Sequence, residues 1–179
     1  EASRLGNEVI LIEPSSRIGG LTTGGLGQTD IGNKQVIGGI ALEFYQNVKK
    51  HYENPNNWIW QEKSEYRDGG QTRSSVTEDA MWTFEPSAAL TVLNEMINDN
   101  KIKVFYNERL ERKKGVTKNE NIIKHIIMES GIIFSAKVFI DATYEGDLLA
   151  SSGVSYTVGR ESNSKYGESL NGNQPNELG

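Results

Sequence analysis

A carboxylate followed by a glycine-rich segment is the part of this sequence best suited to chemistry. Glu13 ends the apolar run 9–12, and glycines recur at positions 19, 20, 24 and 25. An acid at the tip of a buried strand can accept hydrogen bonds from the ribose hydroxyls of a dinucleotide. Glycines let backbone amides approach a phosphate or a flat ring closely. These features indicate the second half of a nucleotide-binding Rossmann motif.

The segment before this strand is typical of the last turn of a helix. Residues 1–6 end on Gly6, a common helix stop. In a Rossmann unit such a helix follows a strand and a G-x-G-x-x-G turn, neither of which occurs here, and the first residue is not Met. We therefore expect an N-terminally truncated domain that lacks the first strand and that turn. The alternative is a complete small α/β domain in which Glu13 merely ends a strand.

Composition narrows the class of protein. The 179 residues suit one domain, with a polar insertion at about 53–79 and a flexible tail at about 160–179. The net charge of −5 argues against nucleic acid and an anionic membrane as partners. With no cysteine and two histidines, the chain has no disulfides and little material for a metal site, and we expect none. A cytoplasmic and a periplasmic location both stay open.

Periodicity predicts the elements around this segment. Apolar residues at every fourth position from Ile40 predict an amphipathic helix over 40–52. A second helix should begin near Glu85 and Pro86 and end around 98–100, followed by a strand over 102–106. A helix followed by such a strand is one crossover of a parallel sheet.

From residue 110 the pattern changes to a period of two. Segments 110–113, 122–129 and 131–136 predict a three-stranded antiparallel meander with a turn at Ser130 and Gly131. Residues 137–142 should then return as a parallel strand. A turn at 143–146 should lead into a short helix that ends at Gly153.

This order of elements resembles the FAD-binding domain of the glutathione-reductase-like flavoproteins. It is most similar to the bacterial FAD-dependent oxidoreductase family, some of whose relatives are labelled xanthan-lyase-like. The stretches that carry the resemblance are 13–14, 19–27, 139–143 and 146–147. The implied fold class is α/β: a Rossmann-like parallel sheet with an antiparallel meander. One departure is Tyr144, which stands where the flavoproteins usually have glycine.

The resemblance implies that FAD is bound non-covalently, Glu13 contacting the adenosine ribose and the glycine-threonine segment the pyrophosphate or flavin. The site residues carried over are Glu13, Arg17, Gly19, Gly20, Thr22, Thr23, Gly24, Gly25, Leu110, Ala142 and Thr143. We expect cofactor contact from a helix-free loop over 19–27; the alternative is a merely flexible loop. His51 and His125 are poor candidates for covalent flavin attachment. A truncated piece would hold FAD weakly or not at all.

The implied activity is hydride transfer from a small-molecule substrate to FAD. The sequence identifies no substrate, catalytic residue or oligomeric state. A second hypothesis is a carbohydrate-binding or polysaccharide-lyase-associated protein without flavin, which would use Trp58, Trp60 and Trp82 as a platform; these side chains could equally anchor the insertion on the core. A third is a truncated domain without activity.

Overall fold

A computed structural model describes residues 1–27, 32–66 and 79–169. The chain divides into two compact units, residues 1–108 and 109–179, and each is described by itself. The first unit holds a two-stranded parallel sheet with helices, and the second a three-stranded antiparallel sheet. The predicted mixed α/β class is therefore confirmed, whereas the single domain stays a prediction.

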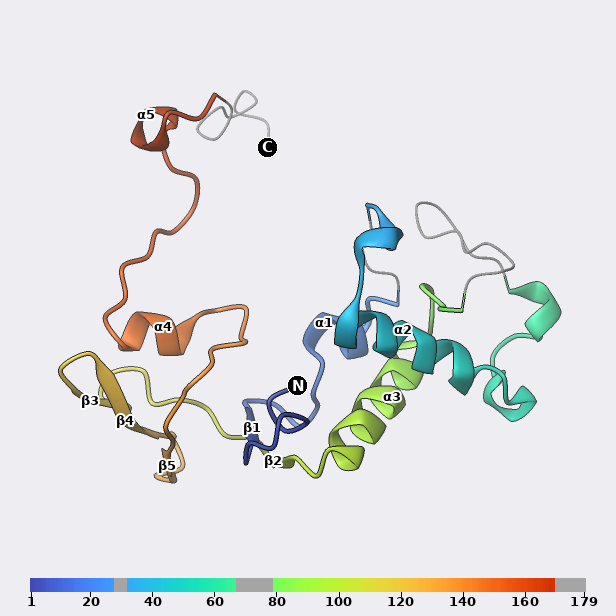
Figure 1. The fold of residues 1–179 in the computed structure, drawn as a ribbon, viewed down its shortest axis with the longest axis horizontal. Coiled ribbons are helices and arrows are strands. Elements are labelled where there is room, and N and C mark those ends of the chain that lie inside the picture. The colour runs from blue at the N-terminus through green and yellow to red at the C-terminus, as the bar shows by residue number, and fades with distance from the viewer. Residues whose placement is uncertain (28–31, 67–78, 170–179) are drawn as a thin grey trace. The chain divides into compact units, whose positions relative to one another are not determined.

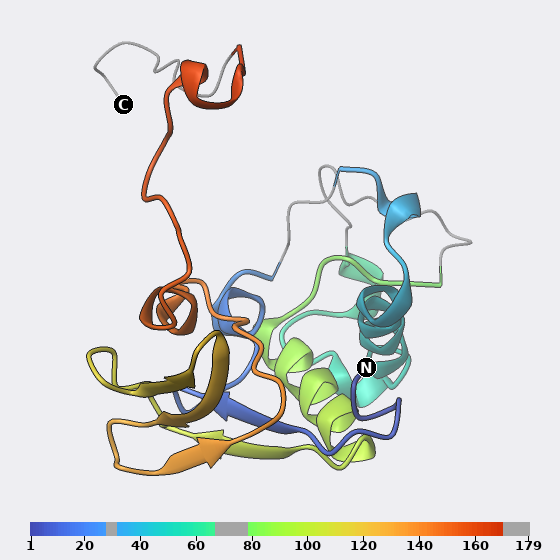
Figure 2. The ribbon, with the colours of Figure 1, turned by 60° about the vertical axis from the view of Figure 1, so that its left-hand side comes forward.

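The parallel sheet of the first unit joins two strands far apart in the sequence. Strand β1 (Ile10–Glu13) pairs with β2 (Lys103–Tyr106), and Glu13 lies opposite Tyr106. Figure 2 shows the two strands side by side. The backbone continues this pairing beyond β2, because the amide of Glu108 donates to the carbonyl of Glu13 at 3.1 Å. Both predicted strands are confirmed, and Glu13 ends β1.

Two helices form the core of the first unit, as their periodicity predicts. Helix α2 (Gly39–His51) and helix α3 (Pro86–Asp99) lie against each other (Figure 1). Their apolar faces meet because residues one turn apart share a side of the helix. The buried residues of this core are Phe44, Val48, Tyr52, Met81, Phe84, Ala88, Ala89 and Val92.

The first residues form one helical turn that ends at Gly6, which has a φ of +82°. The amide of Asn7 donates to the carbonyl of Ala2, and that of Gly6 to the carbonyl of Ser3. This pair of bonds is the Schellman motif, in which a left-handed glycine satisfies the last carbonyls of a helix. The predicted helix end at Gly6 is therefore confirmed.

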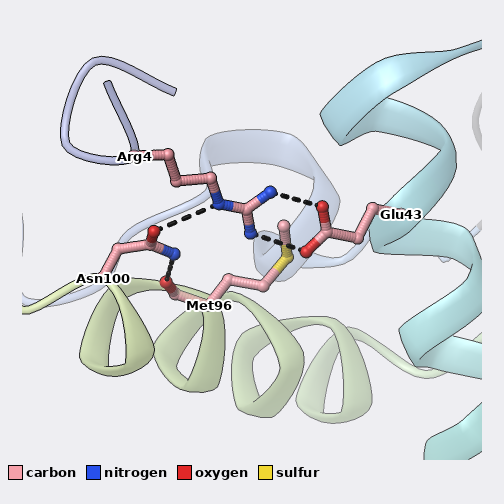
Figure 3. A network of polar contacts seen from close by, with 4 residues as sticks. All are labelled: Arg4, Glu43, Met96 and Asn100. Atoms are coloured by element: carbon pink, nitrogen blue, oxygen red, sulfur yellow. Dashed lines mark hydrogen bonds and ion pairs between the residues drawn. The ribbon is translucent and has the colours of Figure 1, made fainter. Parts of the chain in front are cut away.

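A polar network ties this turn to both long helices (Figure 3). The guanidinium of Arg4 donates to both carboxylate oxygens of Glu43 on α2, at 2.5 and 2.6 Å. Its Nε also donates to the side chain of Asn100, which in turn donates to the carbonyl of Met96. A bidentate arginine fixes geometry as well as charge. The N-terminal turn is thus held over α2 and the end of α3.

The polar insertion contains short helical turns in its described part. Two 3-10 turns, η2 (Pro55–Asn57) and η3 (Lys63–Glu65), flank Trp58, and a further turn, η1 (Lys34–Val36), precedes α2. The rest of the insertion, residues 67–78, lies outside the described residues, as do 28–31 and 170–179.

The sheet of the second unit has the order β3 (Val116–Asn119), β4 (Ile122–Ile127) and β5 (Ile133–Ser135). The turn between β4 and β5 is confirmed, but the predicted first strand at 110–113 is wrong. Leu110 makes only an isolated bridge with Met128. The reason is Glu111, whose carboxylate accepts the amides of Lys113 and Lys114. That turn ends the extended backbone and shifts the strand to 116–119.

The predicted strand over 137–142 is also wrong. None of these residues is in a strand, and the side chains of Val138 and Ile140 are 73% and 78% exposed. A strand needs a neighbour for its amides and carbonyls, and among the described residues none pairs with this segment. The short helix after it is confirmed as α4 (Asp147–Ser151), followed by Gly153 with a φ of +75°.

The described part of the predicted tail contains one more short helix, α5 (Asn163–Tyr166). The side chain of Lys165 forms an ion pair with Glu161 at 2.6 Å. Within the described residues, no helix is both long and apolar enough to cross a membrane.

Candidate cofactor-binding site

The carboxylate of Glu13 is held in place by the residue two positions later. Its Oε1 accepts the backbone amide of Ser15 at 2.8 Å and the hydroxyl of Ser15 at 2.6 Å. Its own carbonyl is paired with Glu108, so that backbone and side chain are both fixed. Among the described residues none donates to Oε2. This oxygen can therefore accept a hydrogen bond from a ligand hydroxyl.

The glycine-threonine segment is not the helix-free loop that we expected. Residues Gly20–Gly24 form the short helix α1 after Gly19, which has a φ of +93°. The hydroxyl of Thr23 donates to the carbonyl of Ile18, and the amide of Thr22 donates to that of Gly19. These local bonds offset the poor helix propensity of glycine. The segment therefore enters α1 through Gly19 in the left-handed conformation, and hydrogen bonds within the segment hold this turn.

Gly19 is required by packing inside the protein. A Cβ at this position would lie 2.4 Å from Cγ2 of Thr23 and 2.7 Å from Cδ1 of Leu93 on α3. Both distances are far inside van der Waals contact, and the positive φ already disfavours a side chain. Thr23 itself is 1% exposed. Gly19 and Thr23 thus seat α1 on α3, a role that the sequence pattern does not reveal.

The other end of the segment is fixed by Gly27. Its carbonyl accepts the amide of Phe84 at 2.9 Å, and a Cβ on Gly27 would lie 2.3 Å from the carbonyl oxygen of Phe84. Phe84 belongs to the buried core. The segment 19–27 is therefore attached to the core at both ends, and sequence reasoning did not single out Gly27 for this.

Between these anchors the segment presents polar groups and open backbone. A Cβ on Gly24 would lie 3.8 Å from Nη2 of Arg17, so that this guanidinium lies beside the end of α1. Gly25 has a φ of +145°, and its Cβ position has nothing within 4 Å. Gly20, with a φ of +53°, and Thr22 lie in the first turns of α1. A cation next to accessible backbone suits a phosphate.

Three further predicted residues lie in the second unit. Leu110 makes the isolated bridge described above, and Ala142 and Thr143 are exposed. The carboxylate of Asp141 accepts the amide of Thr143 at 3.0 Å, its hydroxyl at 2.7 Å, and the amide of Leu149 at 3.1 Å. Partial burial acts to raise the pKa of Asp141, but these hydrogen bonds prevail and hold the pKa below its ordinary value.

The unusual Tyr144 causes no backbone strain in this turn. Within the described residues, the non-glycine positions with positive φ are Lys101, Asn107 and Glu120. The left-handed conformation falls instead on Gly146, with a φ of +68°. The amide of Gly146 donates to the hydroxyl of Thr143 at 3.0 Å. The turn is thus compatible with a side chain at position 144.

Comparison with known families identifies the family of this chain. The family model described as FAD dependent oxidoreductase matches residues 1–178. The chain belongs to the FAD-dependent oxidoreductase family. Membership supports an FAD-binding oxidoreductase function, with which the parallel sheet and the antiparallel sheet are consistent. A search among curated proteins found no match.

The donor set of this family member suits FAD. Glu13 offers an acceptor for a ribose diol, whereas Arg17 and Thr22 offer donors for phosphate oxygens.

In the part of the chain that the structure describes, no group of three or more acidic, histidine or cysteine side chains could hold a metal ion. The tryptophans differ from one another: Trp82 is 1% exposed, Trp58 is partly buried and Trp60 is 83% exposed.

Proposed function

We propose that the first unit of this family member binds the adenosine and pyrophosphate part of FAD without a covalent link. The observation that carries the proposal is the geometry of Glu13. Ser15 fixes the carboxylate through one oxygen, and the other oxygen is available at the end of a parallel strand. An acid at the end of a strand in this position is suited to the ribose hydroxyls of a dinucleotide.

Arg17, Thr22, Gly24 and Gly25 would hold the pyrophosphate. The guanidinium beside Gly24 supplies a charge-assisted donor, and the open backbone at Gly25 allows close approach. Gly19 and Thr23 would support the site indirectly, because they pack α1 against α3. Within the second unit, Leu110, Ala142 and Thr143 stay candidates for further cofactor contacts, each to be tested separately.

A bound flavin would supply the redox chemistry, which is the acceptance of a hydride from a small-molecule substrate. The residues of this chain would hold and orient the cofactor. The net charge of −5 favours a small molecule over a nucleic acid as the substrate.

A titration of the chain with FAD and FMN tests this function. FMN carries the same ring system as FAD but lacks the adenosine and the second phosphate. If Glu13 holds the adenosine ribose, FAD should bind at least about tenfold more tightly than FMN, since hydrogen bonds to a charged group contribute roughly 1.5–3 kcal/mol. Adenosine diphosphate should compete with FAD. Equal affinity for FAD and FMN, or FAD binding that adenosine diphosphate does not reduce, would overturn the proposed site.

A further inference from the structure

A cavity of about 370 Å³ lies in the first unit, away from the glycine segment in sequence. Its walls come from the end of α2, from residues 58–66 and from residues 81–85. The volume is within the range of pockets that hold small organic molecules. Anchoring of the polar insertion on the core would explain the packing of its aromatic residues, but not the open space beside them.

Aromatic rings form much of its wall and stand at steep angles to one another. The ring of Trp58 is tilted by 50° against Tyr52 at 4.9 Å, and it meets Tyr66 at 71° and 5.6 Å. Trp60, whose side chain is 83% exposed, contributes a further ring. Rings at such angles direct their faces along different axes. Their negative π faces attract a cation.

Hydrogen bonds fix the rings of Tyr52, Trp58 and Tyr66 before any ligand arrives. The indole N–H of Trp58 donates to the carbonyl of Tyr52 at 2.8 Å. The hydroxyl of Tyr66 donates to the carbonyl of Thr83 at 3.0 Å, and that of Tyr52 to Oε2 of Glu85 at 2.9 Å. The cavity is therefore preorganised, which lowers the entropy lost on binding.

The charge of the lining decides what kind of ligand suits it. The carboxylates of Glu65 and Glu85 line the cavity, and among its described lining residues none is Lys, Arg or His. An anion would meet two like charges here, and a purely apolar ligand would cover two carboxylates without supplying an opposite charge. A cation satisfies the rings and the carboxylates together.

We propose that this cavity binds a small organic cation, such as a quaternary ammonium group or an alkylated amine. The rings of Trp58, Trp60 and Tyr66 would contact its apolar surface, and Glu65 and Glu85 would balance its charge. This inference goes beyond the proposed FAD site and does not rest on it, because none of the residues that form the cavity is among those proposed to hold FAD.

Choline and its neutral isostere 3,3-dimethylbutan-1-ol provide a matched pair of probes. They have nearly the same shape and differ in the positive charge. The indole N–H signals of the full chain would be followed by NMR during titration with each, at constant ionic strength. We expect choline to shift the signals of Trp58 and Trp60 but not that of buried Trp82. The isostere should bind at least about twofold to fivefold more weakly, the range for cation–π attraction at exposed sites.

Two variants test whether the named residues carry the effect. Trp60→Ala removes an exposed ring and Glu65→Gln removes a charge but keeps the acceptor that caps η3. Each should weaken choline binding by about twofold or more. The control is Glu53→Gln, which removes an exposed carboxylate that does not line the cavity, and choline affinity should then stay the same. Circular dichroism would verify that all three variants are folded.

Three results would overturn the proposal: equal affinity for choline and the isostere, shifts caused by methyl glucoside in place of choline, or no shift with any probe. Equal affinities would indicate an apolar groove, and shifts with the glucoside a sugar platform. The FAD and FMN titration is independent of these outcomes, so that failure of the cavity proposal and failure of the cofactor proposal can be distinguished.

Discussion

Two turns in this protein share the same hydrogen-bond pattern at an acidic side chain but differ in what binds the second carboxylate oxygen. In the first unit, Glu13 accepts the amide and the hydroxyl of Ser15 through one carboxylate oxygen. In the second unit, Asp141 accepts the amide and the hydroxyl of Thr143 in the same way. The second oxygen of Asp141 also accepts the amide of Leu149 on α4, whereas Oε2 of Glu13 has no donor among the described residues.

This difference distinguishes Glu13, which we propose as a binding group, from Asp141, which has a structural role. All the hydrogen bonds of Asp141 come from its own turn and helix, so its carboxylate stabilises the entry to α4. Glu13 has a fixed direction and one oxygen left over, which is the arrangement that a ligand hydroxyl requires. An acid followed by such a turn can therefore be assigned a role by asking where each of its two oxygens is bound.

We expect the greatest loss of stability from a substitution at a left-handed glycine, and each of the two turns is followed by one. Gly19→Ala should lower the free energy of unfolding by about 3 kcal/mol or more, because the new Cβ overlaps Thr23 and Leu93 as well as adopting a positive φ. Gly146→Ala adds a Cβ into open space and should cost only about 1–2 kcal/mol. Urea unfolding measures both. Equal losses would show that the packing of Gly19 against α3 has been overestimated.

A smaller effect is expected when the second oxygen of each acid is replaced. Asp141→Asn keeps one acceptor for Thr143 but places a donor opposite the amide of Leu149, which should cost about 1–2 kcal/mol at this partly solvated site. Glu13→Gln should cost less than about 0.5 kcal/mol, as expected for a change outside the internal bonds. Thermal unfolding, followed by circular dichroism at two wavelengths, measures the loss of stability in both variants. A larger loss for Glu13→Gln would reverse the assigned roles.

The pH dependence sharpens the same contrast. Because the pKa of Asp141 is lowered in the folded protein, its contribution to stability is complete above the ordinary value of 3.8 and is lost as the pH falls through the folded value. The difference in unfolding free energy between the native chain and Asp141→Asn should therefore be constant from pH 7 to about 5 and shrink below pH 4. A difference that grows on acidification would contradict the role assigned to this carboxylate.

Local periodicity predicted the elements whose buried face can be read from the spacing of their own apolar residues. β1, α2, α3, β2 and the hairpin of β4 and β5 were all predicted, because their apolar spacing determines which face is buried. The strand expected at 137–142 has the same kind of apolar pattern, but strand formation depends on a neighbouring strand that the pattern cannot supply. The turn at Glu111 depends on one side chain bonding to two amides, which spacing does not encode.

The sequence predicted the position of Glu13 in the candidate site, but not the contacts that hold the rest of the site. The position of Glu13 at the end of β1 followed from the sequence. The helix α1 did not, since glycine and threonine disfavour helices unless tertiary contacts such as those of Thr23 anchor them. The tight packing at Gly19 and Gly27 depends on Leu93 and Phe84, which are distant in sequence.

The role of Glu13 is tested most directly by the affinity of Glu13→Gln for FAD, measured beside the native chain and the control Glu53→Gln. We expect Glu13→Gln to bind FAD at least about tenfold more weakly, because a charged acceptor is lost, while its stability and its affinity for FMN stay unchanged. Glu53→Gln should behave as the native chain. An unchanged affinity of Glu13→Gln for FAD would contradict the assignment of Glu13 to the adenosine ribose.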